Sequence, residues 1–487
     1  MKSFKRLLSV VLLGAIMVGT IACGNAGNEN DQNLPAQDSS TAPSQPVGYP
    51  YYEGNSLDGE EFTIYNVKKN LWNMICVVQP DELNGETIND AIYNRNEKVK
   101  QNLNCEITEI NAEDYNTMAN DLQTLVLAGD NEYDAVYMPM FLLIGGLTEG
   151  YYKCLDEIDT MHLGESYWDQ VMLNATSLGK KHYFATSSAH LMGWDGLWCL
   201  FFNESMMDDL GLEYPYQLVR DGKWTLDQLS VYSKAAANLN GDDSFAINAN
   251  GNSVYGCVSF ENAVMKFLFG FGVDYVSKDT NDEPVLSCTS ERFISACQQL
   301  AGYFSRDGEY LSASSDSSLD TYYQNFYENQ RSLFLGAELK TAQLLRPMEQ
   351  SFGIVPFPKL DELQENYRST AVHQCAVFTI PVTNTSPEKV GLLFDALSFE
   401  SDATVLGPYF DILVEQKGLR NEESIEMLNL IKETRSFDLG ISYQWVKTME
   451  SSLRGKLLEG STDVVGVIDT YKNEVQDNID KMLKGLK

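Results

Sequence analysis

The sequence predicts an α/β protein with a mostly parallel sheet, and two observations support this. Strand-like and helix-like segments alternate along the first part of the folded chain: 62–65 (strand), 88–103 (helix), 106–110 (strand), 115–125 (helix) and 133–138 (strand). The chain has 487 residues, 44 % of them hydrophobic, which is enough for more than one large core. In such sheets helices cover the faces, and ligands bind beyond the carboxyl ends of the strands.

Side-chain spacing defines the helices. The apolar residues of the first two lie on one helical face each: Ile88, Ile92, Val99 and Leu103, then Tyr115, Met118, Leu122 and Leu125. Thr225 and Gln228 form a capping box that begins another helix, with Trp224 as its hydrophobic staple. Pro387 occupies the first position of a later helix, and an apolar stripe from 468 to 486 predicts a closing helix. Apolar segments predict four buried strands at 197–202, 332–335, 352–356 and 376–381.

Residues 1–22 have the pattern of an export signal. Basic residues precede an apolar run from Leu7 to Ile21, which is shorter than the roughly 20 residues of a membrane span. The run ends in a small residue followed by Cys23, as in a bacterial lipobox, although Thr20 stands where Leu is usual. That resemblance implies that Cys23 is diacylated and becomes the first residue of a lipoprotein held in the cell membrane, on its extracellular face. A plain secreted protein with an incidental cysteine is the alternative.

Residues 23–54 are predicted to be a flexible tether. From 24 to about 50 the composition is dominated by Asn, Gln, Ser, Pro and Gly, and large apolar residues are nearly absent. Such a segment buries too little surface to offset the entropy lost on ordering. The tether would let a folded domain stand away from the lipid and still reach a membrane partner.

The charge of the chain excludes nucleic acid as a partner. Lys and Arg number 35 and Asp and Glu 69, so the net charge is 35 − 69 = −34. Removal of residues 1–22 takes away three basic residues and no acidic ones, which leaves 32 − 69 = −37. Contacts to phosphates need clustered Lys and Arg, and the longest basic cluster lies within the export signal.

Eight cysteines follow Cys23, at positions 76, 105, 154, 199, 257, 288, 297 and 375. None of them form a C-x-x-C pair, which argues against a zinc ribbon or a redox motif. Their even number in an exported protein permits disulfides. Most lie within apolar segments such as Trp198–Phe201, and we therefore favour buried free thiols.

Motifs of known catalytic sites are absent from the sequence. The four histidines form no H-E-x-x-H, and neither a G-x-S-x-G nor a phosphate-binding loop occurs. Pairs of carboxylates, as in glycoside hydrolysis, carry no information among 69 acidic residues. The sequence therefore gives no reason to expect an enzyme.

One segment resembles the opening of a calcium loop. Asn238, Asn240 and Asp242 place oxygen donors at its first, third and fifth positions. Asp243 stands where the loop needs Gly, and Ala249 where it needs a bidentate Glu. A polar turn is the favoured interpretation and weak calcium binding the alternative; we expect no other cofactor.

Several segments together resemble the extracellular solute-binding proteins, family 1, of bacterial ABC importers, which are related to the maltose-binding protein. They are Tyr133–Val136, Leu200–Glu204 with Leu210–Leu212, Gly222–Thr225 and Phe352–Pro358, and Asn84–Asn96 resembles a lipoprotein subgroup. The resemblance spans nearly all of the chain after residue 55. It implies a two-lobed, type II periplasmic-binding-protein-like fold, with hinge strands between the lobes and the ligand in the cleft.

The same resemblance implies the domain boundaries. The chain would cross between lobes near 195–199, 335–337 and 397–401. Lobe one would then comprise 55–196 and 337–398, and lobe two 199–335 and 400–487.

The resemblance also implies a function. The protein would bind a carbohydrate, most simply an oligosaccharide, by lobe closure and deliver it as a monomer to the permease subunits of an ABC importer. Sugar sites combine aromatic faces with fixed polar groups. The candidate ligand contacts are Trp72, His190, Trp194, Asp195, Trp198, Tyr255, Glu338, His373 and Trp445. Core packing is the alternative for each tryptophan. A surface glycan-active hydrolase, or a sensor or adhesin with the same fold, are the alternative functions.

Overall fold

The computed structural model describes residues 48–245, 250–313, 329–370, 375–415, 419 and 421–486. The predicted signal, Cys23, most of the predicted tether and His373 lie outside these residues. Gly48–Lys487 form one compact unit. No helix in the described ranges combines the length and the apolarity that a bilayer crossing requires.

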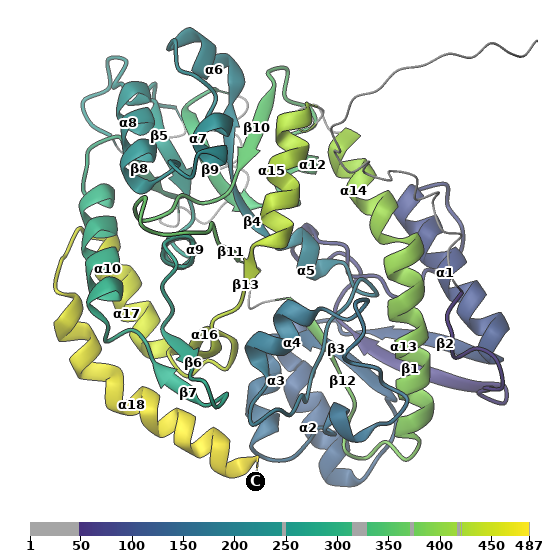
Figure 1. Cartoon of the computed structure of the whole chain (residues 1–487). Coiled ribbons are helices and arrows are strands. Elements are labelled where there is room, and N and C mark those ends of the chain that lie inside the picture. Colours follow the sequence, from purple (N-terminus) through teal and green to yellow (C-terminus); the bar gives the residue numbers. More distant parts are fainter. Residues whose placement is uncertain are drawn as a thin grey trace, which may run out of the picture. The chain divides into compact units, whose positions relative to one another are not determined.

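A four-stranded sheet forms the centre of lobe one, which we define as residues 48–195 and 375–415 (Figure 1). The strand order is β12–β3–β1–β2, and β1 pairs in parallel with both β2 and β3. The strands are β1 (Glu60–Asn66), β2 (Cys105–Asn111), β3 (Ala135–Pro139) and β12 (Ala376–Thr379). The helices are α1 (Thr87–Leu103), α2 (Met118–Ala128), α3 (Met140–Leu147), α4 (Gln170–Thr176), α5 (Met192–Asp195), α13 (Pro387–Thr404) and α14 (Leu406–Glu415), with short 3-10 turns η1 (Leu71–Asn73), η2 (Tyr115–Thr117) and η3 (Leu155–Glu157).

A five-stranded sheet forms the centre of lobe two, which we define as residues 198–370 and 421–486. The strand order is β10–β4–β9–β5–β8, with β5 parallel to both β8 and β9 and with β4 antiparallel to β9. The strands are β4 (Trp198–Asn203), β5 (Tyr255–Ser259), β8 (Tyr310–Ser312), β9 (Ser332–Glu338) and β10 (Phe352–Val355), and a separate hairpin holds β6 (Val276–Lys278) and β7 (Pro284–Leu286).

The helices of lobe two cover its sheet and extend to the C-terminus. They are α6 (Glu204–Asp209), α7 (Tyr216–Arg220), α8 (Leu226–Ala236), α9 (Ala263–Gly270), α10 (Glu291–Phe304), α12 (Thr341–Leu344), α15 (Glu422–Glu433), α16 (Leu439–Ser442), α17 (Lys447–Leu458) and α18 (Val464–Gly485). A two-stranded ladder of β11 (Ser369–Thr370) and β13 (Arg435–Ser436) lies where the chain leaves lobe two. The alternating order predicted for lobe one and all four predicted buried strands are confirmed.

Local sequence explains how α8 and β5 pack. Thr225 caps α8 and accepts a hydrogen bond from the backbone N of Gln228, and Trp224 is fully buried beside it. Gly256 in β5 faces α8 so closely that a Cβ there would lie 2.2 Å from Cβ of Ser233. Only glycine therefore allows this strand to approach the helix.

Two of the predicted crossings between the lobes are wrong. β9 continues to Glu338 within the second sheet, and β10 pairs with β4 in that same sheet, so residues 337–370 belong to lobe two and not to lobe one. The chain returns to lobe one between β11 and β12. No crossing occurs at 397–401, because α13 runs unbroken from Pro387 to Thr404 and packs against α1.

The predicted tether is too long at its C-terminal end. Tyr49 is buried and its hydroxyl donates to Asp395 at 2.8 Å. Tyr51 stacks on His162 at a centroid distance of 3.8 Å, and the Tyr52 hydroxyl donates to Glu400. Residues 49–52 are therefore part of lobe one, because their rings offer apolar surface that the residues before them do not.

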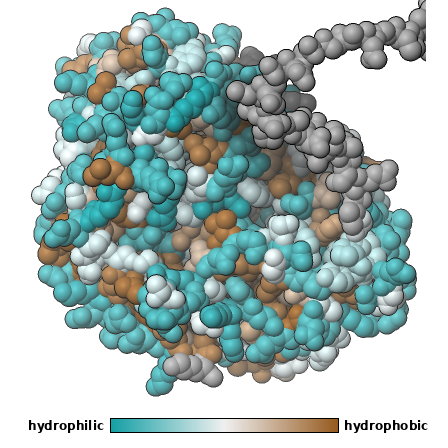
Figure 2. All heavy atoms as spheres, viewed as in Figure 1, coloured by the Kyte–Doolittle hydropathy of each residue, from teal (hydrophilic) through white to brown (hydrophobic). Residues whose placement is uncertain are grey.

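The eight cysteines are buried and free, as predicted. Burial raises the pKa of the Cys105 thiol to about 11 and that of Cys375 to about 12, so these thiols stay protonated. On the face of the molecule in Figure 2, hydrophilic residues predominate and apolar residues are scattered among them. This surface agrees with the acidic composition.

Candidate functional site

The carboxyl edges of the two sheets face each other at the junction of the lobes. Lys340 follows the end of β9, and its ammonium donates to the carbonyl oxygen of Trp72, which follows the end of β1. Beside them, the carboxylate of Asp195 accepts a hydrogen bond of 2.7 Å from the backbone N of Ile75. Ligands of α/β sheets bind at such edges, so this junction is the candidate site.

Lobe one places a row of aromatic rings along its edge. Trp72 follows β1, Tyr115 follows β2 and Phe141 follows β3. The Trp72 and Tyr115 rings meet edge to face at 4.9 Å, and Tyr115 and Phe141 at 6.5 Å. All three are only partly buried, so ring surface remains accessible. Sequence reasoning missed Tyr115 and Phe141, although their positions just after two of the parallel strands were available as a signal.

Lobe two places a polar cavity of about 330 Å³ where β5 ends. Its walls come from the start of α9, from α16 and from α17: Glu261, Asn262, Met265, Ile441, Gln444, Lys447, Glu450, Ser451 and Arg454. Arg454 forms ion pairs with Glu261 and, at 3.0 Å, with Glu450. The cavity therefore offers fixed donors and acceptors in a wall of nearly balanced charge.

Oδ1 of Asn262, in the wall of this cavity, is a buried polar atom without a hydrogen-bond partner among the described residues. Elsewhere in lobe two, Nε1 of Trp198, Nε1 of Trp445 and the hydroxyl of Tyr275 are also buried without a hydrogen-bond partner in the described ranges. Each unpaired buried group costs about 1–3 kcal/mol, so native proteins keep few of them without a functional reason. Asn262 therefore gives the cavity an acceptor that a polar ligand group can satisfy.

A buried carboxylate lies at the end of α5, where the chain leaves lobe one for lobe two. Asp195 accepts from the Tyr409 hydroxyl at 2.8 Å as well as from Ile75. Burial raises the pKa of Asp195 to about 6, against the opposing effects of these donors and of Lys340. His190 lies nearby in the core, 3.3 Å from Asn66 Oδ1, and burial lowers its pKa to about 3. His190 is therefore a neutral structural residue at physiological pH.

A second cavity of about 290 Å³ lies beside α4 and α5. His190 and Trp194 line it, together with Asp402 and Arg435. The Arg435 guanidinium lies 4.1 Å from the centroid of the Trp194 ring and pairs with Asp169 at 2.5 Å. These contacts occupy one face of Trp194. A larger groove of about 710 Å³ lies between α7 and α15, within lobe two.

The structure therefore brings together only part of the predicted site. Trp72, Asp195, Trp198 and Glu338 lie at the junction, since Glu338 pairs in register with Trp198. The remaining described candidates lie elsewhere: His190 and Trp194 at the second cavity, Trp445 stacked on Tyr443 at 4.9 Å, and Tyr255 buried against Phe245 at 5.8 Å.

The predicted calcium segment uses its oxygens internally. Asp242 accepts from Ser253 N and Oγ, both at 2.7 Å, and from Asn252 N. Asn238 Oδ1 accepts from Asn240 N. In the described part of the chain, no three His, Cys, Asp or Glu side chains are grouped so that they could hold a metal.

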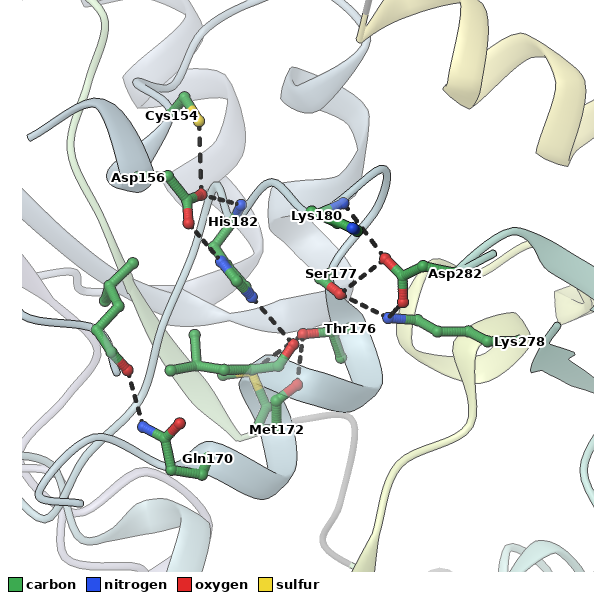
Figure 3. Close-up of polar contacts among 12 residues, drawn as sticks. Cys154, Asp156, Gln170, Met172, Thr176, Ser177, Lys180, His182, Lys278 and Asp282 are labelled. Atoms are coloured by element: carbon green, nitrogen blue, oxygen red, sulfur yellow. Dashed lines mark hydrogen bonds and ion pairs between the residues drawn. The ribbon is translucent and has the colours of Figure 1, made fainter. Parts of the chain in front are cut away.

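A second contact between the lobes involves the β6–β7 hairpin (Figure 3). Lys278 donates to the carbonyl of Asn174 at 2.8 Å and to Ser177 Oγ at 2.6 Å, at the end of α4. Asp282 pairs with Lys278 at 2.8 Å and accepts from Ser177 and from Lys180 N. Tyr443 adds a hydrogen bond of 2.6 Å to the carbonyl of Thr176. These polar contacts join the two lobes together with the ring contact of Phe184 and Tyr443, whose centroids are 5.9 Å apart.

Comparison with known proteins gives structural but no sequence matches. No protein-family model and no curated protein sequence matches the chain. Solved structures that match include a cyclo/maltodextrin-binding protein complexed with maltotetraose, at a TM-score of 0.55 and 13 % identity over 88 % of this chain and 97 % of that one.

Two further matches have different ligands. The maltose/maltodextrin-binding domain MalE of Bdellovibrio bacteriovorus, bound to maltotriose, has a TM-score of 0.53 and 14 % identity over 86 % of this chain and 100 % of that one. UgpB of Mycobacterium tuberculosis, in complex with glycerophosphocholine, has a TM-score of 0.54 and 14 % identity over 86 % of this chain and 98 % of that one. The chain thus has the two-lobed α/β fold of these binding proteins.

Proposed function

We propose that this protein is the carbohydrate-binding receptor of an ABC importer and holds its ligand between the two lobes. The observation that carries the proposal is the pairing of an aromatic row on one sheet edge with a polar cavity on the other. Aromatic faces pack on the C–H patches of a sugar ring, and the cavity walls bind its hydroxyls. Solved structures of the same fold are binding proteins with maltotetraose or maltotriose bound, which supports a receptor over a hydrolase.

Binding would act through the relative position of the lobes. A ligand that touches both Trp72 on lobe one and the cavity on lobe two stabilises the arrangement in which these surfaces lie closest. The equilibrium can shift only by the difference in ligand affinity between the two arrangements. The hydrogen bonds from Lys340 to the Trp72 carbonyl and from Lys278 to the Asn174 carbonyl join the lobes, and they are the ones that would rearrange.

Delivery to the importer would take place at the membrane surface. Acylation of Cys23 would anchor the chain, and the loaded receptor would dock on the permease subunits as a monomer. No bond in the ligand is broken, so the protein needs no catalytic group. Export and anchoring can be tested by metabolic labelling with a palmitate analogue, which a Cys23→Ala variant should not incorporate.

A thermal-shift screen tests the ligand class. The purified chain is heated with neutral oligosaccharides, peptides, polyamines and glycerophosphocholine, each in large excess. A ligand at a hundred times its dissociation constant adds about 2.7 kcal/mol of stability. Stabilisation by saccharides supports the proposal, and stabilisation by non-saccharides alone would overturn it. Release of reducing ends from the bound sugar would favour the hydrolase instead.

A variant of the aromatic row tests the location. Trp72→Ala should weaken saccharide binding at least tenfold, because it removes a large apolar face at the edge of lobe one. Leu127→Ala, at a 71 % exposed position on α2, is the control and should bind as the wild type does. Equal affinities of the two variants would place the site elsewhere.

A further inference from the structure

Lys266 is a buried lysine whose ammonium has no hydrogen bond or ion pair in the part of the chain that the structure describes. It lies on α9, and only 2 % of the residue is exposed. Its Nζ is 5.4 Å from the centroid of the Trp198 ring. A buried charge without a hydrogen bond or ion pair is costly, so its retention here calls for a functional reason.

The ionisable groups around Lys266 come from three other parts of the chain. Glu338 ends β9, Glu450 lies on α17 and the Cys375 thiol immediately precedes β12. Burial lowers the pKa of Lys266 to about 8, although the two carboxylates oppose the shift. Glu450 already accepts a hydrogen bond from Arg454 at 3.0 Å. Lys266 therefore stands between a carboxylate of the cavity wall and one at the sheet edge.

Glu338 is the acceptor that complements Lys266. Within the described ranges its carboxylate makes no hydrogen bond, and the residue is only partly buried. Glu338 is paired in register with Trp198, whose Nε1 is itself a buried donor without a partner. Two donors and one acceptor thus lie together at the junction, with no hydrogen bond between them in the described ranges.

The donors Lys266 and Trp198 and the acceptor Glu338 favour a neutral hydroxyl over an anionic ligand group. A carboxylate or phosphate would satisfy both donors, but it would place a negative charge beside Glu338 and Glu450, and like charges in a poorly solvated site repel strongly. A hydroxyl accepts from Lys266 and donates to Glu338 at once. Adjacent hydroxyls on a sugar ring match such a set without adding charge.

We infer that Lys266, Trp198 and Glu338 form a subsite for adjacent hydroxyls of a neutral saccharide, and that this subsite excludes acidic saccharides. The inference rests on the proposed function and adds to it the charge class of the ligand. Lys266 donates from its ammonium, Trp198 from Nε1, and Glu338 accepts. Because the charged lysine is the better donor, affinity falls as pH rises through about 8.

Binding of matched probes by the full chain tests the subsite. The probes are neutral tetrasaccharides (maltotetraose, cellotetraose and xylotetraose) and tetragalacturonate as their acidic counterpart. We expect the wild type to bind a neutral probe and to bind tetragalacturonate at least tenfold more weakly. Tighter binding of tetragalacturonate than of every neutral probe would overturn the inference.

Three variants separate a ligand contact from a structural role. Lys266→Met should lower the affinity for the neutral probe at least tenfold and abolish its decline between pH 7 and pH 9. Lys234→Met, on the exposed side of α8, makes the same chemical change away from the site and should bind like the wild type. Glu338→Gln retains the shape of the side chain without its charge and should reduce the preference for neutral over acidic probes. This third variant decides the matter if Lys266→Met does not fold.

The two possible failures can be distinguished. A wild-type chain that binds no saccharide overturns both the proposed function and the subsite. A wild-type chain that binds a neutral probe, with unchanged affinity and pH dependence in Lys266→Met and unchanged preference in Glu338→Gln, overturns the subsite alone.

Discussion

Replacement of Asp395 by asparagine should strongly destabilise lobe one. The carboxylate is fully buried in α13 and contacts donors from the N-terminal residues and from the segment before α4. Oδ2 lies 2.8 Å from the Tyr49 hydroxyl, 2.8 Å from that of Tyr167 and 2.7 Å from His162 Nδ1, and Oδ1 lies 3.0 Å from His162 N and 2.8 Å from Trp168 Nε1. An amide in this place presents N–H groups to at least two of these donors.

The magnitude follows from how many of these donors the amide leaves without an acceptor. A hydrogen bond to a charged group contributes about 1.5–3 kcal/mol, so the absence of two to three of them predicts a destabilisation of about 3–6 kcal/mol. Tyr49→Phe removes only one of the hydrogen bonds and should cost about 1.5–3 kcal/mol. In the double variant the Tyr49 change should cost less than it does alone, because its partner is already gone.

Urea unfolding followed by circular dichroism measures these differences. Asp477→Asn, at an exposed position on α18, is the matched control and should change the free energy of unfolding by less than about 0.5 kcal/mol. A destabilisation below about 1 kcal/mol in Asp395→Asn would refute the reasoning. So would fully additive effects in the double variant.

Three further predictions concern the core. Ellman's reagent should label none of the eight cysteines of residues 48–487 in the native state and all eight in guanidinium, and fewer in guanidinium would contradict their being free. Gly256→Ala should cost at least about 2 kcal/mol in urea unfolding because of its close approach to α8, whereas Gly145→Ala, which meets no atom within 4 Å, should be nearly neutral. For Asp195 the folded-state pKa of about 6 exceeds the unfolded value of about 3.9, so its contribution to stability is complete below pH 4 and is lost as the pH rises through 6. The wild type should therefore lose about 2–3 kcal/mol between pH 4 and pH 7 that Asp195→Asn does not lose, and parallel pH profiles would contradict this.

The positions of helices and strands could be predicted from the sequence better than the pairing of the strands. Spacing and caps depend on neighbouring residues, so α1, α8 and the buried strands could be identified directly. The segment at 352–355 was correctly predicted as a strand but placed in the wrong lobe. Its pairing with β4 joins residues about 150 positions apart, and local periodicity carries no information on such a pairing.

The candidate site could be predicted only in part, for a related reason. Trp72 was found because it follows a recognisable strand, and the same logic would have found Tyr115 and Phe141. Lys266 was missed because it lies in an apolar run, where a helix buried on all sides is the simplest interpretation. A single charge within such a run was the available signal.

The attachment of residues 49–52 to lobe one has a mechanical consequence. Tyr49 and Tyr52 bind α13 through Asp395 and Glu400, so any pull on the chain before them is transmitted to lobe one alone. In an anchored receptor, lobe one would therefore stay fixed relative to the anchor, and lobe two would move relative to lobe one. A permease would then detect ligand by the position of lobe two relative to the membrane. A force on the tether would act on lobe one only and would not oppose closure of the lobes.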